Sequence, residues 1–196
     1  MPKRGFEGIE EFEAHIKGVG EIIFDGFENL TERPQNYEKQ KVKYSGKKGT
    51  HTDVSLLMSD KKKQIYYVSK LYDGSNVDFG ILKKEFEPGM GWFKNLKVLV
   101  DLGFQGMGKI YKIKELIIGD KKPKKSKKNP FPKLTGEQKE KNKKVSRERI
   151  FVEHAIGRLK KFRILKNRCR IKCQKLKNQI IGICAGLSNY LLDLKH

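Results

Sequence analysis

Short apolar runs in the first 120 residues predict the strands of a β-sheet. The run Ile22–Phe24 defines a strand that begins at Glu21, and the runs "DVSLLM" and "QIYYVS" flank "SDKKK", which is typical of a β-hairpin. The run "VLV" at 98–100 predicts a fourth strand, and "KELIIGD" at 114–120 predicts a fifth. We therefore expect five strands.

Helical periodicity predicts three longer helices. In "GSNVDFGILKKEFEPG", Ser75 and Asp78 have the spacing of a capping box, and Pro88-Gly89 ends the pattern. A second helix is expected to begin at Ser146, after a hydrophobic staple formed by Val145 and Ile150, and a third spans 174–194. The expected apolar faces are Val152, Ala155, Ile156, Leu159 and Phe162 on the second helix, and Leu176, Ile180, Ile183, Leu187, Leu191 and Leu194 on the third.

The order of these elements indicates the α/β fold class, with a mixed five-stranded sheet flanked by helices. A helix lies between the first and fourth strands, and such a crossover allows these strands to pair in parallel as neighbours. Residues 1–20 are expected to be an N-terminal extension or the remnant of an upstream region, and the folded domain is expected to span residues 21–196. Six lysines at 121–128 and three prolines predict a flexible, lysine-rich insertion at about 120–145.

The charge of the chain points to a polyanionic partner. There are 44 Lys and Arg residues against 23 Asp and Glu residues, which gives a formal net charge of +21. Residues 158–177 contain ten basic residues and no acid, a density of like charge that favours contact with nucleic acid. An anionic membrane surface is the weaker alternative, because the basic stretches lack an apolar face and no apolar run approaches the ~18 residues of a membrane span.

Three cysteines, Cys169, Cys173 and Cys184, lie within the last 30 residues and form no paired framework. We expect reduced thiols of a cytosolic protein that serve as small apolar side chains. A zinc site that combines Cys169 and Cys173 with His154 is the alternative, but two cysteines without a second pair are a weak signal.

Two aspartates follow apolar runs in the same way, and the repetition points to a metal site. Asp25 follows Ile22–Phe24 and precedes Gly26, and Asp101 follows the run at 98–100. On parallel neighbouring strands the two carboxylates would lie within a few ångströms of each other, where like charges need a cation. Oxygen ligands without histidine favour Mg²⁺ or Mn²⁺, and two such ions ~3.5–4 Å apart promote in-line displacement at phosphorus.

Two ions need a third carboxylate, and Glu153 is the candidate because its helix must pack against the sheet. Taken alone, Asp25 fits a turn-forming Asp-Gly pair, and Glu153 fits a helix-surface acid paired with Arg149 or Lys160. Asp78 is a further candidate ligand, but the capping box is sufficient to explain it.

Several blocks of the chain, from about Ile22 to Leu165, resemble the DDE transposases of the insertion-sequence-five type. They are "IIFDGFEN", "RPQNYEKQKVKYSGKKGTHT", "YDGSNVDF", "VLVDLGFQG" and "LTGEQKEKNKKVSRERIFVEHAIGRLKKFRIL". The resemblance implies a ribonuclease H-like catalytic domain whose metal-binding catalytic triad is Asp25, Asp101 and Glu153. Phe27 departs from the Thr that is common in the family.

The resemblance implies a metal-dependent endonuclease, with two Mg²⁺ or Mn²⁺ ions, that cleaves DNA and transfers strands for a prokaryotic insertion sequence. Its partner would be double-stranded DNA, at the element ends and the target, in the cytoplasm and nucleoid. Such transposases carry a helical DNA-binding region before the catalytic strands, whereas Asp25 lies 24 residues after Met1. A separate N-terminal DNA-binding chain and a homo-oligomer are therefore open alternatives.

The alternative function is that of a decayed or repurposed relative that binds nucleic acid without cleaving it. A purely structural nucleic-acid-binding protein would leave the three acids unexplained. The basic stretches supply the expected contacts to the DNA backbone, and these residues are Lys121, Lys122, Lys124, Lys125, Lys127, Lys128, Arg158, Lys160, Lys161 and Arg163.

Overall fold

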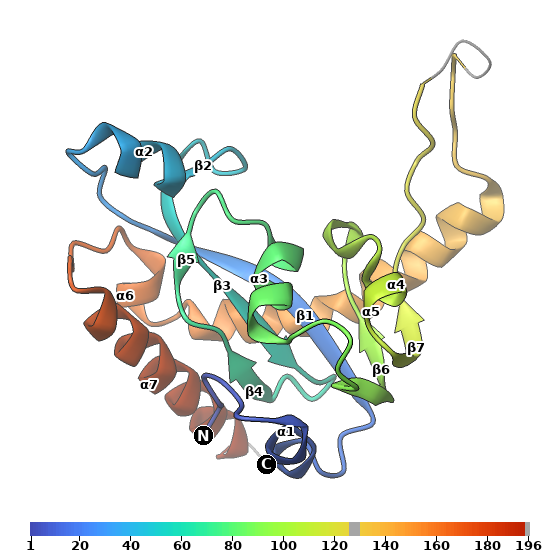
Figure 1. Ribbon diagram of the computed structural model, residues 1–196, viewed down its shortest axis with the longest axis horizontal. Coiled ribbons are helices and arrows are strands. Elements are labelled where there is room, and N and C mark those ends of the chain that lie inside the picture. The colour runs from blue at the N-terminus through green and yellow to red at the C-terminus, as the bar shows by residue number, and fades with distance from the viewer. Residues whose placement is uncertain (126–129, 195–196) are drawn as a thin grey trace.

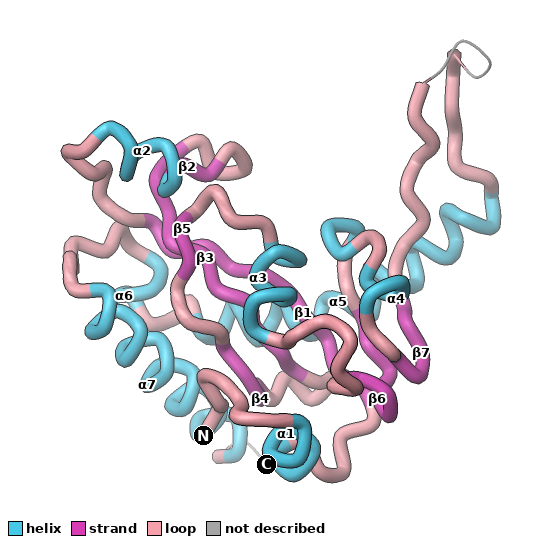
Figure 2. The backbone as a smooth tube through the Cα atoms, in the orientation of Figure 1, coloured by secondary structure: helices cyan, strands magenta, loops and turns pink. Residues whose placement is uncertain are grey.

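A curled β-sheet with helices on both faces forms the centre of the molecule (Figure 1 and Figure 2). The computed structural model describes residues 1–125 and 130–194. Within these residues there are seven strands, β1 (Glu21–Leu30), β2 (Tyr44–Ser45), β3 (Thr50–Ser59), β4 (Ile65–Val68), β5 (Tyr72–Asp73), β6 (Phe93–Leu99) and β7 (Ile113–Ile117). They join in the order β2-β3-β1-β6-β7, and β4 and β5 also pair with β3.

All five predicted strands are present, but the predicted number was wrong. Two further strands, β2 and β5, have two residues each and are too short to show a hydrophobic pattern. The predicted parallel pairing of the first and fourth strands is confirmed, since β1 and β6 pair from Glu21↔Lys97 to Ile23↔Leu99. The apolar run Ile22–Phe24 predicted a strand that ends at Asp25, but β1 continues in antiparallel pairing with β3 as far as Leu30↔Thr52.

Helices cover both faces of the sheet. They are α1 (Ile9–His15), α2 (Tyr37–Lys43), α3 (Asp78–Glu85), α4 (Met107–Ile110), α5 (Gly136–Leu159), α6 (Arg163–Lys166) and α7 (Gln174–Asp193), with a 3₁₀ turn, η1, at Leu102–Phe104. Side chains alternate along β1, so that Ile22 and Phe24 face a core shared with α1 and α3, while Ile23 and Phe27 face a core shared with α5 and α7. No helix of the described residues is long and apolar enough to cross a membrane.

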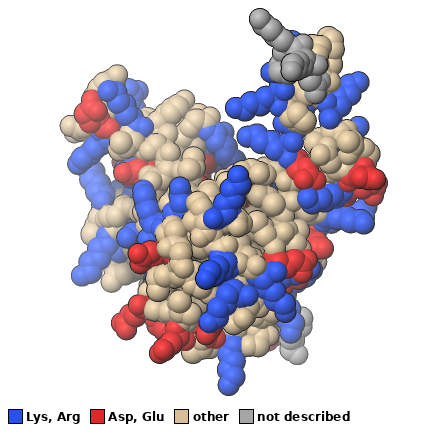
Figure 3. Space-filling model, turned by 45° about the vertical axis from the view of Figure 1, so that its right-hand side comes forward, with Lys and Arg blue, Asp and Glu red and all other residues tan. Residues whose placement is uncertain are grey.

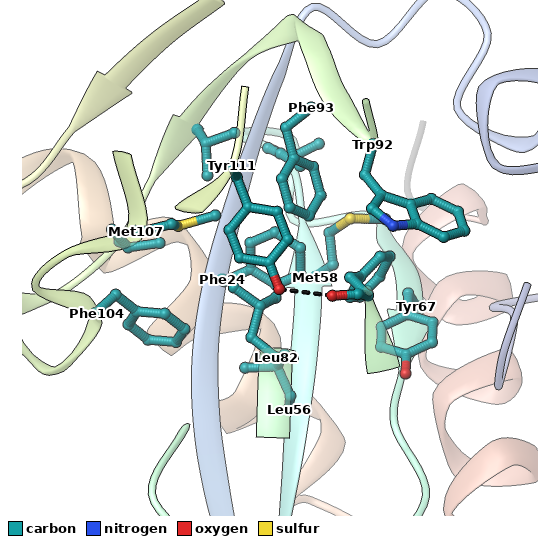
Figure 4. Packing of buried hydrophobic residues seen from close by; sticks show 14 of the residues in the cluster. Phe24, Leu56, Met58, Tyr67, Leu82, Trp92, Phe93, Phe104, Met107 and Tyr111 are labelled. Carbon is teal, nitrogen blue, oxygen red and sulfur yellow. Dashed lines mark hydrogen bonds between the residues drawn. The ribbon is translucent and has the colours of Figure 1, made fainter. Parts of the chain in front are cut away.

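The first core is rich in aromatic side chains (Figure 4). The ring of Phe24 contacts those of Phe86 and Phe93 at centroid distances of 5.8 and 5.6 Å. The hydroxyl of Tyr111 donates a hydrogen bond of 2.6 Å to the carbonyl oxygen of Phe86, so this buried polar group is satisfied. These contacts fix the start of β6 at Phe93, and the strand runs from there toward Asp101.

The predicted capping box at Ser75 and Asp78 was wrong. The residue that caps α3 is Val77, which has no side-chain bond to the helix, and Asp78 is the first helical residue. The backbone N–H of Ser75 instead donates to the carbonyl oxygen of Val42, in the last turn of α2. Ser75 is therefore bonded to α2 and does not cap α3. The carboxylate of Asp78 therefore needs another explanation.

The long helix α5 begins ten residues before the predicted start at Ser146. Thr135 and Gln138 form a reciprocal capping box there, a signal that the high lysine content of the segment obscured. Of the predicted insertion, residues 120–125 and 130–135 are extended, and they leave the body of the molecule as an arm (Figure 1). The base of this arm, residues 118–125 and 130–135, is bonded to α5, because the side chain of Asn142 both accepts from the N–H of Asp120 and donates to its carbonyl oxygen.

The predicted apolar face of α7 was also wrong except at Ile180, which packs against the core shared with α5. Leu176, Ile183, Leu187, Leu191 and Leu194 are exposed. The face that packs on the sheet consists of smaller or polar residues, Lys177, Ile181, Cys184, Ala185, Ser188 and Asn189. Two of these polar side chains have partners: Asn189 bonds to the backbone of Ile65 in β4, and the Lys177 ammonium group lies 2.8 Å from the Asp53 carboxylate. Hydrogen bonding thus overrides the hydrophobic pattern at this interface.

A candidate active site beside β1 and β6

Asp25 and Asp101 lie at the same edge of the sheet. Parallel pairing ends at Ile23↔Leu99, and each aspartate lies two residues beyond this last pair. Asp25 remains on β1, opposite Leu57 of β3, and its carboxylate accepts the N–H of Gly26 at 3.0 Å. Asp101 has left β6 and caps η1, where its carboxylate accepts the N–H of Gly103. The predicted juxtaposition therefore arises, with one aspartate on a strand and the other on a turn.

One guanidinium group reaches both carboxylates. Nη2 of Arg149, on α5, lies 3.4 Å from Oδ2 of Asp25 and 3.9 Å from Oδ2 of Asp101. Burial raises the pKa of Asp25, the positive charge of Arg149 opposes this rise, and the charge of Asp101 adds to it. The two acids thus form a site that favours a cation, and in this structure Arg149 supplies the positive charge.

Glu153 lies one turn after Arg149 on α5 and is exposed. It lines a pocket of about 170 Å³ together with Asp25, Lys160 and the turn residues Lys47 and Lys48. Among the described residues neither Arg149 nor Lys160 forms an ion pair with Glu153, although sequence analysis offered both as partners. Glu153 therefore faces the same space as Asp25 with its carboxylate available.

Asp78 is a fourth acid at this site, and sequence reasoning assigned it elsewhere. A methyl group placed on Gly26 would lie 1.9 Å from Oδ1 of Asp78, so the carboxylate packs directly on the backbone of β1. Burial and the nearby charge of Asp25 raise the pKa of Asp78 to about 6. A signal was present, because glycine within a strand often marks the close approach of another group.

The donor atoms of these residues fit a hard divalent cation. Asp25, Asp101 and Glu153 offer carboxylate oxygens, which suit Mg²⁺ or Mn²⁺. The contacts of Arg149 with both Asp25 and Asp101 show that these two carboxylates share one positive charge. In residues 1–125 and 130–194 no three His, Cys, Asp or Glu side chains are grouped so closely that they would hold a metal ion as they stand. Glu153 would have to move toward the aspartates to share one.

Basic residues surround the carboxylates. Lys160 donates a hydrogen bond of 3.0 Å to the carbonyl oxygen of Glu28 and also lines an open pocket of about 690 Å³ with Lys161 and Arg163. Arg158 points elsewhere, since its guanidinium group donates to the carbonyl oxygen of Lys63 and lies in a different pocket, against Leu191 of α7. Of the predicted contacts on α5 and the segment that follows, Lys160, Lys161 and Arg163 share one groove, and Arg158 does not line it.

The arm carries further positive charge. Figure 3 shows Lys and Arg side chains along the arm and on the face of the molecule below it. The predicted DNA contacts Lys121, Lys122, Lys124 and Lys125 are exposed there. Lys127 and Lys128 lie outside the described residues.

Two comparisons place the chain among known proteins. Residues 24–189 match the family described as DDE superfamily endonuclease. A protein of Microchaete diplosiphon, named "Probable transposase for insertion sequence element IS702", is 38% identical over 177 residues. That alignment covers 89% of this chain and 58% of the relative, so the chain spans little more than half of the relative's length. No solved structure has significant similarity to the chain.

Proposed function

Because the chain belongs to the DDE superfamily endonucleases, we propose that it cleaves DNA phosphodiester bonds and transfers DNA strands during transposition of an insertion sequence. The relationship to a probable transposase supports this choice of substrate and reaction. One observation carries the proposal. Asp25 and Asp101 lie beyond the paired ends of two parallel strands, close enough for a single guanidinium group to contact both.

The proposed catalytic residues are Asp25, Asp101 and Glu153, which would also hold two Mg²⁺ or Mn²⁺ ions. Such ions, when bound, lower the pKa of attacking water and offset the charge on the leaving oxygen. Asp25 is suited to this role because its pKa is raised by burial, so that its ionised form gains from a cation.

The proposed reaction has two displacement steps at phosphorus. In the first, water attacks the phosphodiester at the element end, the P–O3′ bond breaks, and the products are a 3′-hydroxyl and a 5′-phosphate. In the second, this 3′-hydroxyl attacks a target phosphodiester, and a new P–O3′ bond forms as the target P–O3′ bond breaks. Each step is an in-line exchange of one oxygen for another and needs no oxidant or reductant.

The basic residues would bind and orient the DNA. Lys160, Lys161 and Arg163 line an open groove that continues from the pocket of Asp25 and Glu153, because Lys160 lines both. Lysine ammonium groups contact backbone phosphates and carry little information about base sequence. The lysines of the arm would extend the same contact along the duplex, since α5 connects the arm to the site.

The strand arrangement supports a finer proposal about the fold. In β4-β3-β1-β6-β7, the first three strands are antiparallel neighbours and the last three are parallel neighbours. We propose that this mixed sheet, with its acids beside the central pair, is ribonuclease H-like. A homo-oligomer and a separate N-terminal DNA-binding chain are also part of the proposal.

Asp101→Asn is the direct test. It removes one negative charge and one ligand oxygen from a partly exposed turn, so the protein should fold normally while Mn²⁺-dependent nicking of duplex DNA falls by at least ~10²-fold. Asp193→Asn, at the exposed end of α7, is the control and should nick as the wild type does. Wild-type nicking by folded Asp101→Asn would refute the assignment. DNA binding without nicking by the wild type would favour the alternative, a relative that binds nucleic acid but does not cleave it.

A further inference from the structure

The turn between β2 and β3 is short and internally bonded. It comprises Ser45, Gly46, Lys47, Lys48 and Gly49. The buried hydroxyl of Ser45 accepts the N–H of Lys48 at 3.2 Å. The backbone carbonyl oxygen of Ser45 accepts the N–H of Gly49 at 2.8 Å. Gly49 has a φ of +62°, a conformation that glycine adopts without strain. The turn therefore holds Lys47 and Lys48 exposed at its tip in a defined position.

This tip lies beside the carboxylates of the candidate active site. Lys47 lines the pocket of about 170 Å³ that contains Asp25 and Glu153, and also a second pocket, of about 630 Å³, that contains Asp78 and Asp101. Its charge is close enough to lower the pKa of Asp25, although burial dominates and raises it. The turn is thus one wall of the site, and α5 is the wall across from it.

Three lysine side chains, those of Lys47, Lys48 and Lys160, line this space. Lys48 shares the smaller pocket with Lys160 of α5. Burial is the main cause that lowers the pKa of Lys160, and the charges of Lys48 and Lys47 lower it further. In the part of the chain that the structure describes, no carboxylate pairs with any of the three, and Lys160 donates to a backbone carbonyl oxygen. Like charges this close favour an anion between them.

We propose that Lys47 and Lys48 bind a backbone phosphate of the DNA substrate and hold it against the carboxylates, with Lys160 contacting it from α5. The assignment of these two residues is new and rests on the proposed function. Lysine supplies a point charge with rotating donors, which suits phosphate oxygens. Lys47 and Lys48 would therefore position the strand at the active site without reading its sequence.

The test compares two pairs of lysines in hairpin turns. The double variant K47Q/K48Q removes the proposed contact, and K62Q/K63Q, in the turn between β3 and β4, removes the same charge away from both pockets. Both are made in an Asp101→Asn background, so that the DNA stays intact, and affinity for a fluorescent duplex is measured against salt concentration. K47R/K48R, which keeps the charges, is the rescue variant.

We expect K47Q/K48Q to weaken binding about tenfold at low salt and to reduce the slope of log affinity against log salt by ~1, the loss of about one phosphate contact. K62Q/K63Q should weaken binding less than about twofold, and K47R/K48R should bind nearly as the parent does. With Asp101 restored, K47Q/K48Q should need more DNA for half-maximal nicking. Thermal midpoints within about 2 °C of the parent will show that the exposed turn is intact.

Equal effects of the two glutamine pairs would overturn the inference, because general charge alone would then explain the loss. An unchanged slope for K47Q/K48Q would overturn it as well. If either result is obtained with a wild-type protein that binds and nicks DNA, the proposed function is retained and only this inference fails. A wild-type protein that does not bind DNA would overturn the proposed function and this inference together.

Discussion

Asp78 provides a sharp test of the electrostatics of the site, because its raised pKa has a consequence for stability. In the unfolded chain its pKa is near the ordinary 3.8, and in the folded protein burial and Asp25 raise the pKa to about 6. Above pH 6 the carboxylate is ionised in both states and its burial destabilises the fold. As the pH falls from 6 to 4 the carboxylate becomes protonated in the folded state, so most of this cost disappears, and the remainder disappears below the unfolded pKa. Asp78→Asn should therefore stabilise the protein at neutral pH and not at acid pH.

The size of the effect follows from the shift. A rise in the pKa of Asp78 from 3.8 to about 6 corresponds to roughly 3 kcal/mol of destabilisation by the ionised carboxylate. This is an upper bound, because the side chain is partly exposed. An ionised Asp78 also gains ~0.3–1 kcal/mol at the first turn of α3, where the helix dipole favours negative charge, and Asn loses this gain. We expect Asp78→Asn to raise the free energy of unfolding by ~1–2 kcal/mol at pH 7.5, a rise in Tm of roughly 2–8 °C.

The assay is thermal unfolding at pH 7.5 and pH 4, with a chelator present so that bound cations do not offset the charge. Asp73→Asn is the control, because Asp73 lies nearby on β5 but forms an ion pair of 3.0 Å with Lys43. It should not stabilise the protein at either pH. No gain for Asp78→Asn at pH 7.5, or a gain that persists undiminished at pH 4, would refute the reasoning.

Two further substitutions test the packing around the site and beneath it. Gly26→Ala should lower the free energy of unfolding by ~1–3 kcal/mol, because the added methyl group clashes with Asp78, and this loss should largely vanish in an Asp78→Ala background. Urea unfolding measures both, and additive losses would contradict the packing of Asp78 on Gly26. Lys177→Met should lower the free energy of unfolding by ~3 kcal/mol, because it leaves the buried Asp53 carboxylate with Lys43 as its remaining cation. A loss under ~1 kcal/mol would show that Lys43 alone neutralises Asp53.

The central sheet and its two aspartates could be predicted because they depend on local pattern. The apolar runs around Ile22–Phe24 and 98–100 are buried on both sides, so their hydrophobicity is continuous and marks them as strands. The helical crossover through α3 then favours parallel pairing, and the placement of Asp25 beside Asp101 follows. What these patterns did not reveal was that β1 continues past Asp25 on its other partner, β3.

The features that were missed depend on tertiary contacts. The outward face of α7 is the more hydrophobic one, and its inward face is selected by hydrogen bonds from Asn189 and by the ion pair of Lys177. Asp78 was assigned to a capping box because the spacing from Ser75 fits, whereas its actual neighbour, Gly26, is distant in sequence. Periodicity reports the side chains of one element, and it carries no information about which groups of another element will meet them.

The helix α5 links the features that bear on function. Val152, Ala155 and Leu159 pack on the sheet, which fixes the rotation of the helix. Arg149 consequently faces the aspartates, and Lys160 reaches the groove beside the pocket. Since α5 is one continuous helix of 24 residues, its contact with the base of the arm through Asn142 lies two turns, or ~10 Å along the axis, before Arg149. The base of the lysine-bearing arm is thereby held at a set distance from the carboxylates. A duplex that contacts both this base and the groove of Lys160 would therefore run past the carboxylates, which lie between these two contacts.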